Sequence, residues 1–524
     1  MGKPLDYFAN ETLLFNRQAG GELTVLTCFP NTYQVGMASL GYQTVFKLFA
    51  SNPKTHTVRA FTDVIEQNVQ AKDIGLMSFS ISWELDFYEV MQILDKLGIP
   101  FKASERGPEH PLIFAGGPVV TANPEPWAEF FDFIAIGDSE ALIEPIIDLS
   151  LEYQEEIASA APRNDTGEPR NNQKVSLRAE RSNLIQHIFS KQAGLYVPSL
   201  QKFFTRDKNP NGTSKTSIER IKTNPNNLAG TSVIAPDSYW QDTYLLEVVR
   251  SCPEMCKFCL ASFVALPFRA PKLESDLIPK IEEALKHTHS IGLLGASVTQ
   301  HPEFIDLLEY LSKLPEPPKV QVASVRASTV TPEMTDLLKK LKVESLTIAI
   351  ESGSEKLREE INKKLPQEYI YSAAKAAHDS ELRALKLYGM VGLPTETEED
   401  LDLTIDLLLD LKKQNSSLSP SGSAKGKPGL KITYGCSVFT PKMQTPYEGY
   451  RVDEDAERKL KKLQKALKPK GIDFRPESFK WAKVQEMISI GDRSTSDLMH
   501  YVYKTGKNSY SSYKKYLKEH KTKK

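Results

Sequence analysis

The stretch TYLLEVVRSCPEMCKFCLAS (243–262) decides how this chain is interpreted. Its first part, 243–251, is rich in apolar and β-branched residues and predicts a buried strand. Three cysteines follow at once, Cys252, Cys256 and Cys259. Thiolates spaced C-x3-C-x2-C on one short loop can converge on three irons of a cuboidal iron–sulfur cluster. One iron then keeps no protein ligand, and an open metal position is where a substrate or cofactor coordinates.

Structural zinc is the alternative for a group of cysteines. Zinc ribbons usually pair two C-x2-C knuckles to give four ligands. The only other cysteines, Cys28 and Cys436, are far away in the sequence, each within a predicted strand. A histidine could supply the fourth ligand, but none occurs within 25 residues of the motif. The pattern therefore favours an iron–sulfur cluster over zinc.

Strands and amphipathic helical stretches alternate on both sides of the motif. Apolar runs predict six strands, at 243–251, 290–297, 319–326, 345–352, 385–393 and 430–439. Helical stretches lie between them, for example at 276–288, 331–342 and 397–413. Six βα repeats predict a partial (β/α)6 TIM-type barrel, with a flexible loop over 416–429 before its last strand. The cysteine loop then lies at a carboxyl strand end, where barrel enzymes build their active sites.

The motif, with the aromatic Phe258 before its last cysteine, resembles the signature of the radical S-adenosylmethionine (radical SAM) superfamily over roughly 240–447. The resemblance implies that Cys252, Cys256 and Cys259 ligate a 4Fe–4S cluster whose open iron binds S-adenosyl-L-methionine. It also implies that one electron cleaves this cofactor to methionine and a 5′-deoxyadenosyl radical, which abstracts hydrogen from a substrate. An electron donor such as flavodoxin or ferredoxin would be a partner.

Other strand ends match the same superfamily. The segment LLGASV (293–298) occupies the place of a methionine-binding segment but lacks its acidic residue. That contact would then fall to the backbone carbonyls of Gly295 and Ala296. Ser324 and Arg326 stand where ribose or carboxylate contacts usually lie, with a surface-capping loop as the equal alternative.

Glu351 and Arg326 are the candidate catalytic residues. Glu351 ends the fourth strand, where its carboxylate could meet a cofactor amine, take a substrate proton or cap the next helix. In GMVGLPTETEEDL (389–401), Gly392 would allow close backbone approach to the adenine. The acidic residues of that segment are expected to mark a helix N-terminus rather than a metal site.

The N-terminal part predicts a second parallel sheet. Strands are expected at 21–30, 71–80, 111–118 and 131–138, with helices at 39–52 and 86–99. This is a Rossmann-like arrangement, whose ligand crevice lies at the carboxyl ends of the strands.

The stretches PLIFAGGPVVTANPEP (111–126), FDFIAIGDSEALIEPI (131–146) and AGLYVP (193–198) resemble radical SAM proteins with a cobalamin-binding domain. The stretches INKKLP (361–366), KLYGMVGLPTETEEDL (386–401) and FTPKMQTPYE (439–448) resemble an uncharacterised bacterial group of these fused proteins. Base-off cobalamin binding usually uses a histidine, and the corresponding loop, 28–42, contains none. Cobalamin binding therefore stays open against a degenerate domain that holds substrate or supports the barrel.

The whole chain of 524 residues is expected to form several domains. We expect a cobalamin-binding-like domain over 1–150, a linker over 151–238 with a polar insertion at about 159–190, the barrel over 239–447, and a C-terminal extension over 448–524. A net charge of −1 gives no general attraction to nucleic acid or to an anionic membrane. The first twenty residues lack a signal peptide, no apolar run is long enough to span a membrane, and five cysteines are too few for a disulfide scaffold, so the cytoplasm is expected.

Two further functions are alternatives. A methylthiotransferase-like modification of tRNA or protein usually needs three more cysteines upstream, and only Cys28 precedes the motif. The tail over 500–524, rich in lysine and tyrosine, has a composition that suits RNA binding, although a frayed solvated helix explains it better. The substrate is not readable from the sequence.

Overall fold

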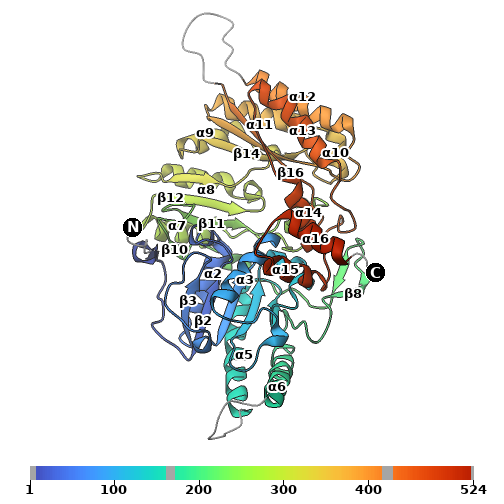
Figure 1. Ribbon diagram of the computed structural model, residues 1–524. Helices are drawn as coiled ribbons and strands as arrows, with labels where there is room; N and C mark the ends of the chain where they lie inside the picture. The colour runs from blue at the N-terminus through green and yellow to red at the C-terminus, as the bar shows by residue number, and fades with distance from the viewer. Residues whose placement is uncertain (1–6, 161–170, 416–428, 521–524) are drawn as a thin grey trace, which may run out of the picture. The chain divides into compact units, whose positions relative to one another are not determined.

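The computed structural model describes residues 7–160, 171–415 and 429–520 (Figure 1). The chain divides into two compact units. The N-terminal unit contains residues 1–223, 231–242 and 487–524, and the barrel unit contains residues 224–230 and 243–486. The C-terminal extension expected over 448–524 is thus divided between the two units at residue 487. Among the described helices, none combines the length and the apolar composition needed to cross a bilayer.

The N-terminal unit is built on a six-stranded sheet. Its strands, in sheet order, are β3 (Thr55–Ala60), β2 (Leu23–Cys28), β4 (Leu76–Ser80), β5 (Leu112–Gly116), β6 (Phe133–Ala135) and β7 (Leu195–Tyr196). The first five run parallel and β7 pairs antiparallel to β6. The chain places β3 on one side of β2 and β4 on the other, so the strand order reverses there. Such a switch point opens a crevice at the carboxyl ends of β2 and β4.

Apolar faces of three helices close one side of this sheet. Phe49 of α2 (Leu40–Ala50), Ile146 of α5 (Ser139–Ala160) and Phe189 of α6 (Asn171–Phe189) belong to one buried cluster with side chains of β2, β4, β5 and β6. The four predicted strands and the helices at 39–52 and 86–99 are all present, the second as α3 (Phe87–Lys96). The Rossmann-like architecture expected for this part is confirmed.

The polar insertion expected at about 159–190 is wrong over its second part. Residues 171–189 form α6, which the sequence did not predict because its apolar and polar residues show no helical periodicity. Residues 161–170 of the predicted insertion lie outside the described residues. Strand β3 was also missed, because THTVRA (55–60) contains a histidine and an arginine that interrupt the apolar pattern.

The barrel unit contains all six predicted barrel strands. Together with one further strand, β17 (Asp473–Pro476), they form two parallel sheets. The first contains β11 (Tyr244–Val249), β12 (Ser290–Gly295) and β13 (Lys319–Val322), and the second contains β14 (Ser345–Glu351), β15 (Ala384–Val391), β16 (Lys431–Val438) and β17. A parallel bridge between Val325 and Ile348 joins the end of β13 to β14. The expected (β/α)6 barrel is therefore confirmed. The added strand β17 was missed because DFRP has a single buried apolar residue, Phe474. The flexible loop predicted at 416–429 falls almost entirely outside the described residues.

Helices cover the outside of the barrel strands. The principal ones are α7 (Ile278–Leu285), α8 (Phe304–Lys313), α9 (Pro332–Lys340), α11 (Gln367–Asp379), α12 (Glu398–Gln414) and α13 (Ala456–Leu467). The acidic run before α12 does mark a helix N-terminus, because Thr397 and Asp400 form a capping box there.

The end of the chain returns to the N-terminal unit. Helices α15 (Thr495–Lys504) and α16 (Tyr510–His520) are drawn in red in Figure 1 beside the blue α3. The Tyr503 hydroxyl donates to Asp95 of α3 at 3.2 Å, and the Tyr513 ring meets that of Phe87 at a right angle. The predicted frayed and solvated helix is wrong, since Tyr513 is fully buried.

Candidate active site

The cysteine loop begins where β11 ends. Cys256 is buried, Cys252 and Cys259 are half-buried, and all three are free thiols. Ser251 and Met255 have φ angles of 73° and 57°. Left-handed backbone at two positions of one short segment turns the chain sharply. The three cysteines are thereby kept on a single compact loop at the carboxyl end of the first barrel strand.

The three thiols lie close enough to act on one another electrostatically. Burial raises the pKa of Cys256 to about 12, which the Lys363 ammonium opposes and the neighbouring Cys259, Glu351 and Cys252 reinforce. Burial also raises the pKa of Cys259, against hydrogen bonds that its sulfur accepts from the N–H groups of Ser262 and Ala261. Within the described ranges, no three His, Cys, Asp or Glu side chains are arranged to hold one metal ion.

This donor set fits an iron–sulfur cluster. In a cuboidal cluster each thiolate binds a different iron. The three cysteines therefore need to lie on one loop, but their sulfurs need not converge on a single atom. The backbone N–H groups that donate hydrogen bonds to Cys259 favour its thiolate form, and the Lys363 cation does the same for Cys256. A cluster needs its cysteines in this form.

Asn362 braces the loop from a distance of more than one hundred positions in the sequence. Its side-chain amide donates to the carbonyls of Glu254 at 3.1 Å and Met255 at 2.7 Å. The Lys257 N–H donates to the Ile361 carbonyl at 3.0 Å. The two amide bonds satisfy carbonyls between the first two cysteines, and the Lys257 bond fixes the backbone just after Cys256.

Gln300 forms a second brace, directly against a cysteine. Its amide nitrogen donates to Glu254 Oε1 at 2.5 Å, and its oxygen lies 3.9 Å from the Cys252 sulfur, which donates to it. Ser297 donates to the same oxygen at 2.5 Å. The segment after β12 therefore positions Cys252 through Gln300.

Arg326, predicted to contact cofactor or to act in catalysis, is engaged by the protein itself. Its guanidinium pairs with Glu254 at 3.1 Å and donates to the carbonyls of Lys363 at 3.1 Å and Lys364 at 2.7 Å. Arg326 thus ties the cysteine loop to the segment after α10 (Glu355–Glu360). In this arrangement it positions the loop.

Glu351, the other predicted catalytic residue, lies at the carboxyl end of β14 as expected. It is buried, has a φ of 64°, and pairs with Lys363 at 2.8 Å. Burial lowers the pKa of Lys363, but the charges of Glu351 and Cys256 outweigh it and hold that pKa above its ordinary value. The lysine cation thus pairs with the carboxylate and also acts on the buried thiol.

The predicted cofactor-binding positions gather at the same edge. Gly295 ends β12 with a φ of 154°, and a Cβ there would lie 2.6 Å from the Val249 carbonyl oxygen. Gly392 follows β15 with a φ of 76°, and its N–H donates to Glu396. Ala296 is exposed and Ser324 is half-buried after β13. Phe258 packs against the apolar cluster that contains Leu393, Phe439 and Tyr447.

Sequence reasoning missed the residues that hold the loop, Glu254, Gln300, Asn362 and Lys363. Lys363 and Asn362 belong to the quoted stretch INKKLP, but nothing in that pattern shows that it packs against the cysteines. The one available signal was an asparagine outside a helix, a residue that adopts left-handed backbone readily. Asn362 has a φ of 60°.

Polar side chains gather at the switch point of the N-terminal sheet, where a ligand crevice is expected. Asn31 follows β2 and Asp86 follows β4, and their side chains are hydrogen-bonded. Burial, reinforced by Glu89, raises the pKa of Asp86 to about 7. Trp83 beside them is 51% exposed. An exposed indole and a carboxyl that binds its proton tightly suit a ligand crevice.

The comparisons with known proteins agree with these two parts. Residues 41–166 match the family described as radical SAM proteins, N-terminal, and residues 246–408 match the radical SAM superfamily. The uncharacterised protein MJ0966 of Methanocaldococcus jannaschii is 26% identical over 91% of this chain and 90% of its own length. The tRNA-2-methylthio-N(6)-dimethylallyladenosine synthase of Rickettsia canadensis is 26% identical over 36% of this chain, a match that spans 45% of that enzyme.

Among solved structures, the cobalamin-dependent S-adenosylmethionine radical enzyme OxsB with aqua-cobalamin bound has a TM-score of 0.51 at 13% identity. The similarity covers 91% of this chain and 66% of that one, and at this identity it shows a shared fold. The two matched families together span more than half of the 524 residues, and the second includes all three motif cysteines. The chain is therefore an enzyme of the radical SAM superfamily.

Proposed function

We propose that this protein cleaves S-adenosyl-L-methionine reductively at a 4Fe–4S cluster held by Cys252, Cys256 and Cys259. The observation that supports this most is the cysteine loop itself, three free thiols at the carboxyl end of β11 with Asn362, Gln300 and Arg326 bracing the backbone between them. When bound, the cluster supplies the electron that breaks a carbon–sulfur bond of S-adenosylmethionine, giving methionine and a 5′-deoxyadenosyl radical.

The chain's own residues would bind and orient the cofactor around that loop. We expect the backbone carbonyls of Gly295 and Ala296 to bind the methionine end. Gly392 would allow close approach of the adenine, and Ser324 would contact the ribose. The Glu351–Lys363 pair would fix the charge beside Cys256. The Glu351 carboxylate could bind the ammonium group of the cofactor only while it also binds Lys363.

The experiment compares two multiple variants after anaerobic reconstitution with iron and sulfide. Cys252→Ala, Cys256→Ala and Cys259→Ala together should lose the roughly four irons per chain and all formation of 5′-deoxyadenosine. The matched control is Cys28→Ala with Cys436→Ala, which removes the two buried thiols of β2 and β16. This control should keep both its iron and the formation of 5′-deoxyadenosine. Iron retained by the triple variant would overturn the proposal.

We propose that the enzyme acts in the cytoplasm and receives its electron from a small electron carrier. All five cysteines are free thiols, which accords with a reducing compartment. A flavodoxin or ferredoxin would supply the electron. Anaerobic incubation with labelled S-adenosylmethionine and cell extract, followed by separation of nucleic acid, protein and small molecules, identifies the class of substrate that takes up the label.

Cobalamin-dependent group transfer is the second candidate, and the crevice at the switch point of the N-terminal sheet supports it. The loop over 28–42 offers no histidine to cobalt, so any corrinoid would be held by shape and by groups such as Asn31 and Trp83. Retention of hydroxocobalamin absorbance through gel filtration, lost in Trp83→Ala, tests it. Passage of all corrinoid in the salt volume would exclude this candidate.

A further inference from the structure

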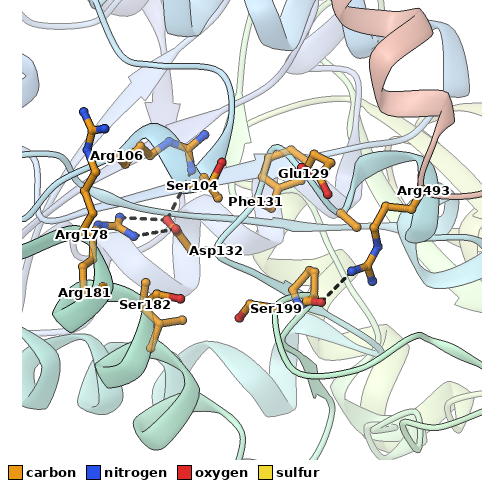
Figure 2. Close-up of a pocket in the computed structure, with 15 residues that line it drawn as sticks. Ser104, Arg106, Glu129, Phe131, Asp132, Arg178, Arg181, Ser182, Ser199 and Arg493 are labelled. Atoms are coloured by element: carbon orange, nitrogen blue, oxygen red, sulfur yellow. Dashed lines mark hydrogen bonds and ion pairs between the residues drawn. The ribbon is translucent and has the colours of Figure 1, made fainter. Parts of the chain in front are cut away.

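A second cavity lies in the N-terminal unit, at the edge of the sheet opposite to the crevice. It has a volume of about 330 Å³ and is drawn in Figure 2. Residues 128–132, which lead into β6, and residues 103–106 form one side of it. Asp132 accepts the N–H of Ile113 at 2.8 Å, next to the start of β5. The cavity is thus at the amino ends of β5 and β6, whereas the crevice is at the carboxyl ends of the strands.

The floor of this cavity carries an unbalanced positive charge. The guanidiniums of Arg106 and Arg181 both pair with the single carboxylate of Asp132, at 3.4 and 2.7 Å, and all three side chains are almost fully buried (Figure 2). Burial lowers the pKa of Arg106 to about 10, against the attraction of Asp132, and the charge of Arg181 adds to that lowering. Two cations on one anion leave a net charge in surroundings where it is weakly screened.

One donor of that floor has no acceptor. Within the part of the chain that the structure describes, the buried Nε–H of Arg181 makes no hydrogen bond. Buried polar groups are nearly always paired, so an orphan arginine N–H beside a cavity indicates a missing acceptor. The side chain of Arg181 is 2% exposed.

The rim adds further donors from separate segments. Arg178 of α6 is exposed and forms no ion pair with any described residue, whereas Arg493 is held by Glu125 at 3.2 Å and by the Pro198 carbonyl. The hydroxyls of Ser104 and Ser199 stand at the same rim. Four arginines line the cavity against two carboxylates, Asp132 and Glu129.

We propose that this cavity binds a small oxyanion ligand, a metabolite that carries a phosphate or a carboxylate group. Guanidinium groups match the geometry of both anions. Serine hydroxyls can donate further hydrogen bonds to the remaining oxygen atoms of the anion. Apolar lining from Ala103, Phe131 and Pro198 leaves room for a short organic body beside the anionic group. The site goes beyond the proposed S-adenosylmethionine chemistry and does not depend on it.

Isothermal titration calorimetry of the full chain as isolated tests the site, with inorganic phosphate and citrate as separate probes at constant ionic strength. We expect one of them to bind, which identifies phosphate or carboxylate as the group recognised. Arg178→Ala should weaken that binding about tenfold through the loss of a charge-assisted hydrogen bond. Ser104→Glu, an exposed change that places an anion at the rim, should weaken it at least as much.

Arg206→Ala is the matched control, because Arg206 is an exposed arginine of the same unit outside the cavity. It removes the same charge and should leave the affinity unchanged. Equal weakening by Arg206→Ala and Arg178→Ala would reduce the effect to general electrostatics and overturn the proposal. If neither phosphate nor citrate bound at concentrations up to about 10 mM, the proposal would be overturned as well.

Discussion

At the scale of single residues, Asn362 offers the sharpest test of how the cysteine loop is held. Alanine at position 362 loses both hydrogen bonds to the loop carbonyls and must keep a φ of 60°, which costs about 1–2 kcal/mol. We expect Asn362→Ala to release iron from the reconstituted protein several-fold faster to a chelator. Asn362→Gly relieves the backbone but not the lost amide, so it should also release iron quickly.

The control is Lys342→Ala, a side-chain truncation at another left-handed residue, with a φ of 62°. Because lysine and alanine both carry a Cβ, it should leave the backbone strain and the rate of iron loss unchanged. If Asn362→Gly held iron as firmly as the wild type, the side-chain brace would have no role.

Asp86 makes a prediction about pH. Burial raises its pKa in the folded protein to about 7 from 3.8, so the folded state binds this proton more tightly than the unfolded state does. The stabilising effect of the proton is complete below about pH 4 and is lost as the pH rises to about 7. Asp86→Asn removes this loss, and we expect it to be more stable than the wild type by about 4 kcal/mol at pH 8 and equal at pH 4.

Urea unfolding of both proteins at pH 4, 6 and 8 measures this difference. Parallel pH profiles for Asp86→Asn and the wild type would contradict the prediction.

The residues of the candidate site were predictable to different degrees. The three cysteines and the strand ends at Gly295, Glu351 and Gly392 follow from local spacing, because each lies within a few residues of an apolar run. Its position at a strand end predicted Arg326 as a site residue. Its bonds to Glu254 and to the carbonyls at 363–364 could not be predicted, because they join segments far apart in the sequence. Side-chain partners of that kind are set by tertiary packing.

At the scale of elements, α6 shows why a helix can escape sequence analysis. It is attached to the sheet partly by Arg181, which bonds Asp132 and the Pro111 carbonyl, rather than by an unbroken apolar stripe. Asp132→Asn would leave two buried guanidiniums facing each other. We expect it to lower the free energy of unfolding of the N-terminal unit by about 3 kcal/mol or more, with faster amide exchange along α6.

Asp148→Asn is the matched control for that change. Asp148 pairs with Lys54 at 2.7 Å, but both side chains are about half exposed, so its loss should lower the free energy of unfolding much less than Asp132→Asn does. Equal effects of the two substitutions on urea unfolding would show that the buried triad does not anchor α6.

At the scale of the whole molecule, the N-terminal unit is discontinuous in sequence. Residues 487–524 belong to it, and the barrel unit is inserted between its parts. Periodicity along the chain predicts elements one after another and contains no information about such a return. The lysines and tyrosines of the tail therefore allowed two interpretations, a surface for RNA or an unimportant helix end, and the structure adds a third, a folded cap.

The cap interpretation separates the tyrosines of the tail from its lysines. Tyr513 is fully buried against Phe87, so Tyr513→Ala should cost about 3 kcal/mol and lower the melting temperature by several degrees. Lys514, Lys515 and Lys518 are exposed, and their joint replacement by alanine should leave the melting temperature unchanged. Mobility-shift assays with RNA at 50 and 200 mM salt complete the comparison. If α16 serves only to cap the N-terminal unit, the lysine variant and the wild type should bind RNA equally. Salt-sensitive RNA binding that is lost in the lysine variant would instead assign the helix a nucleic-acid partner.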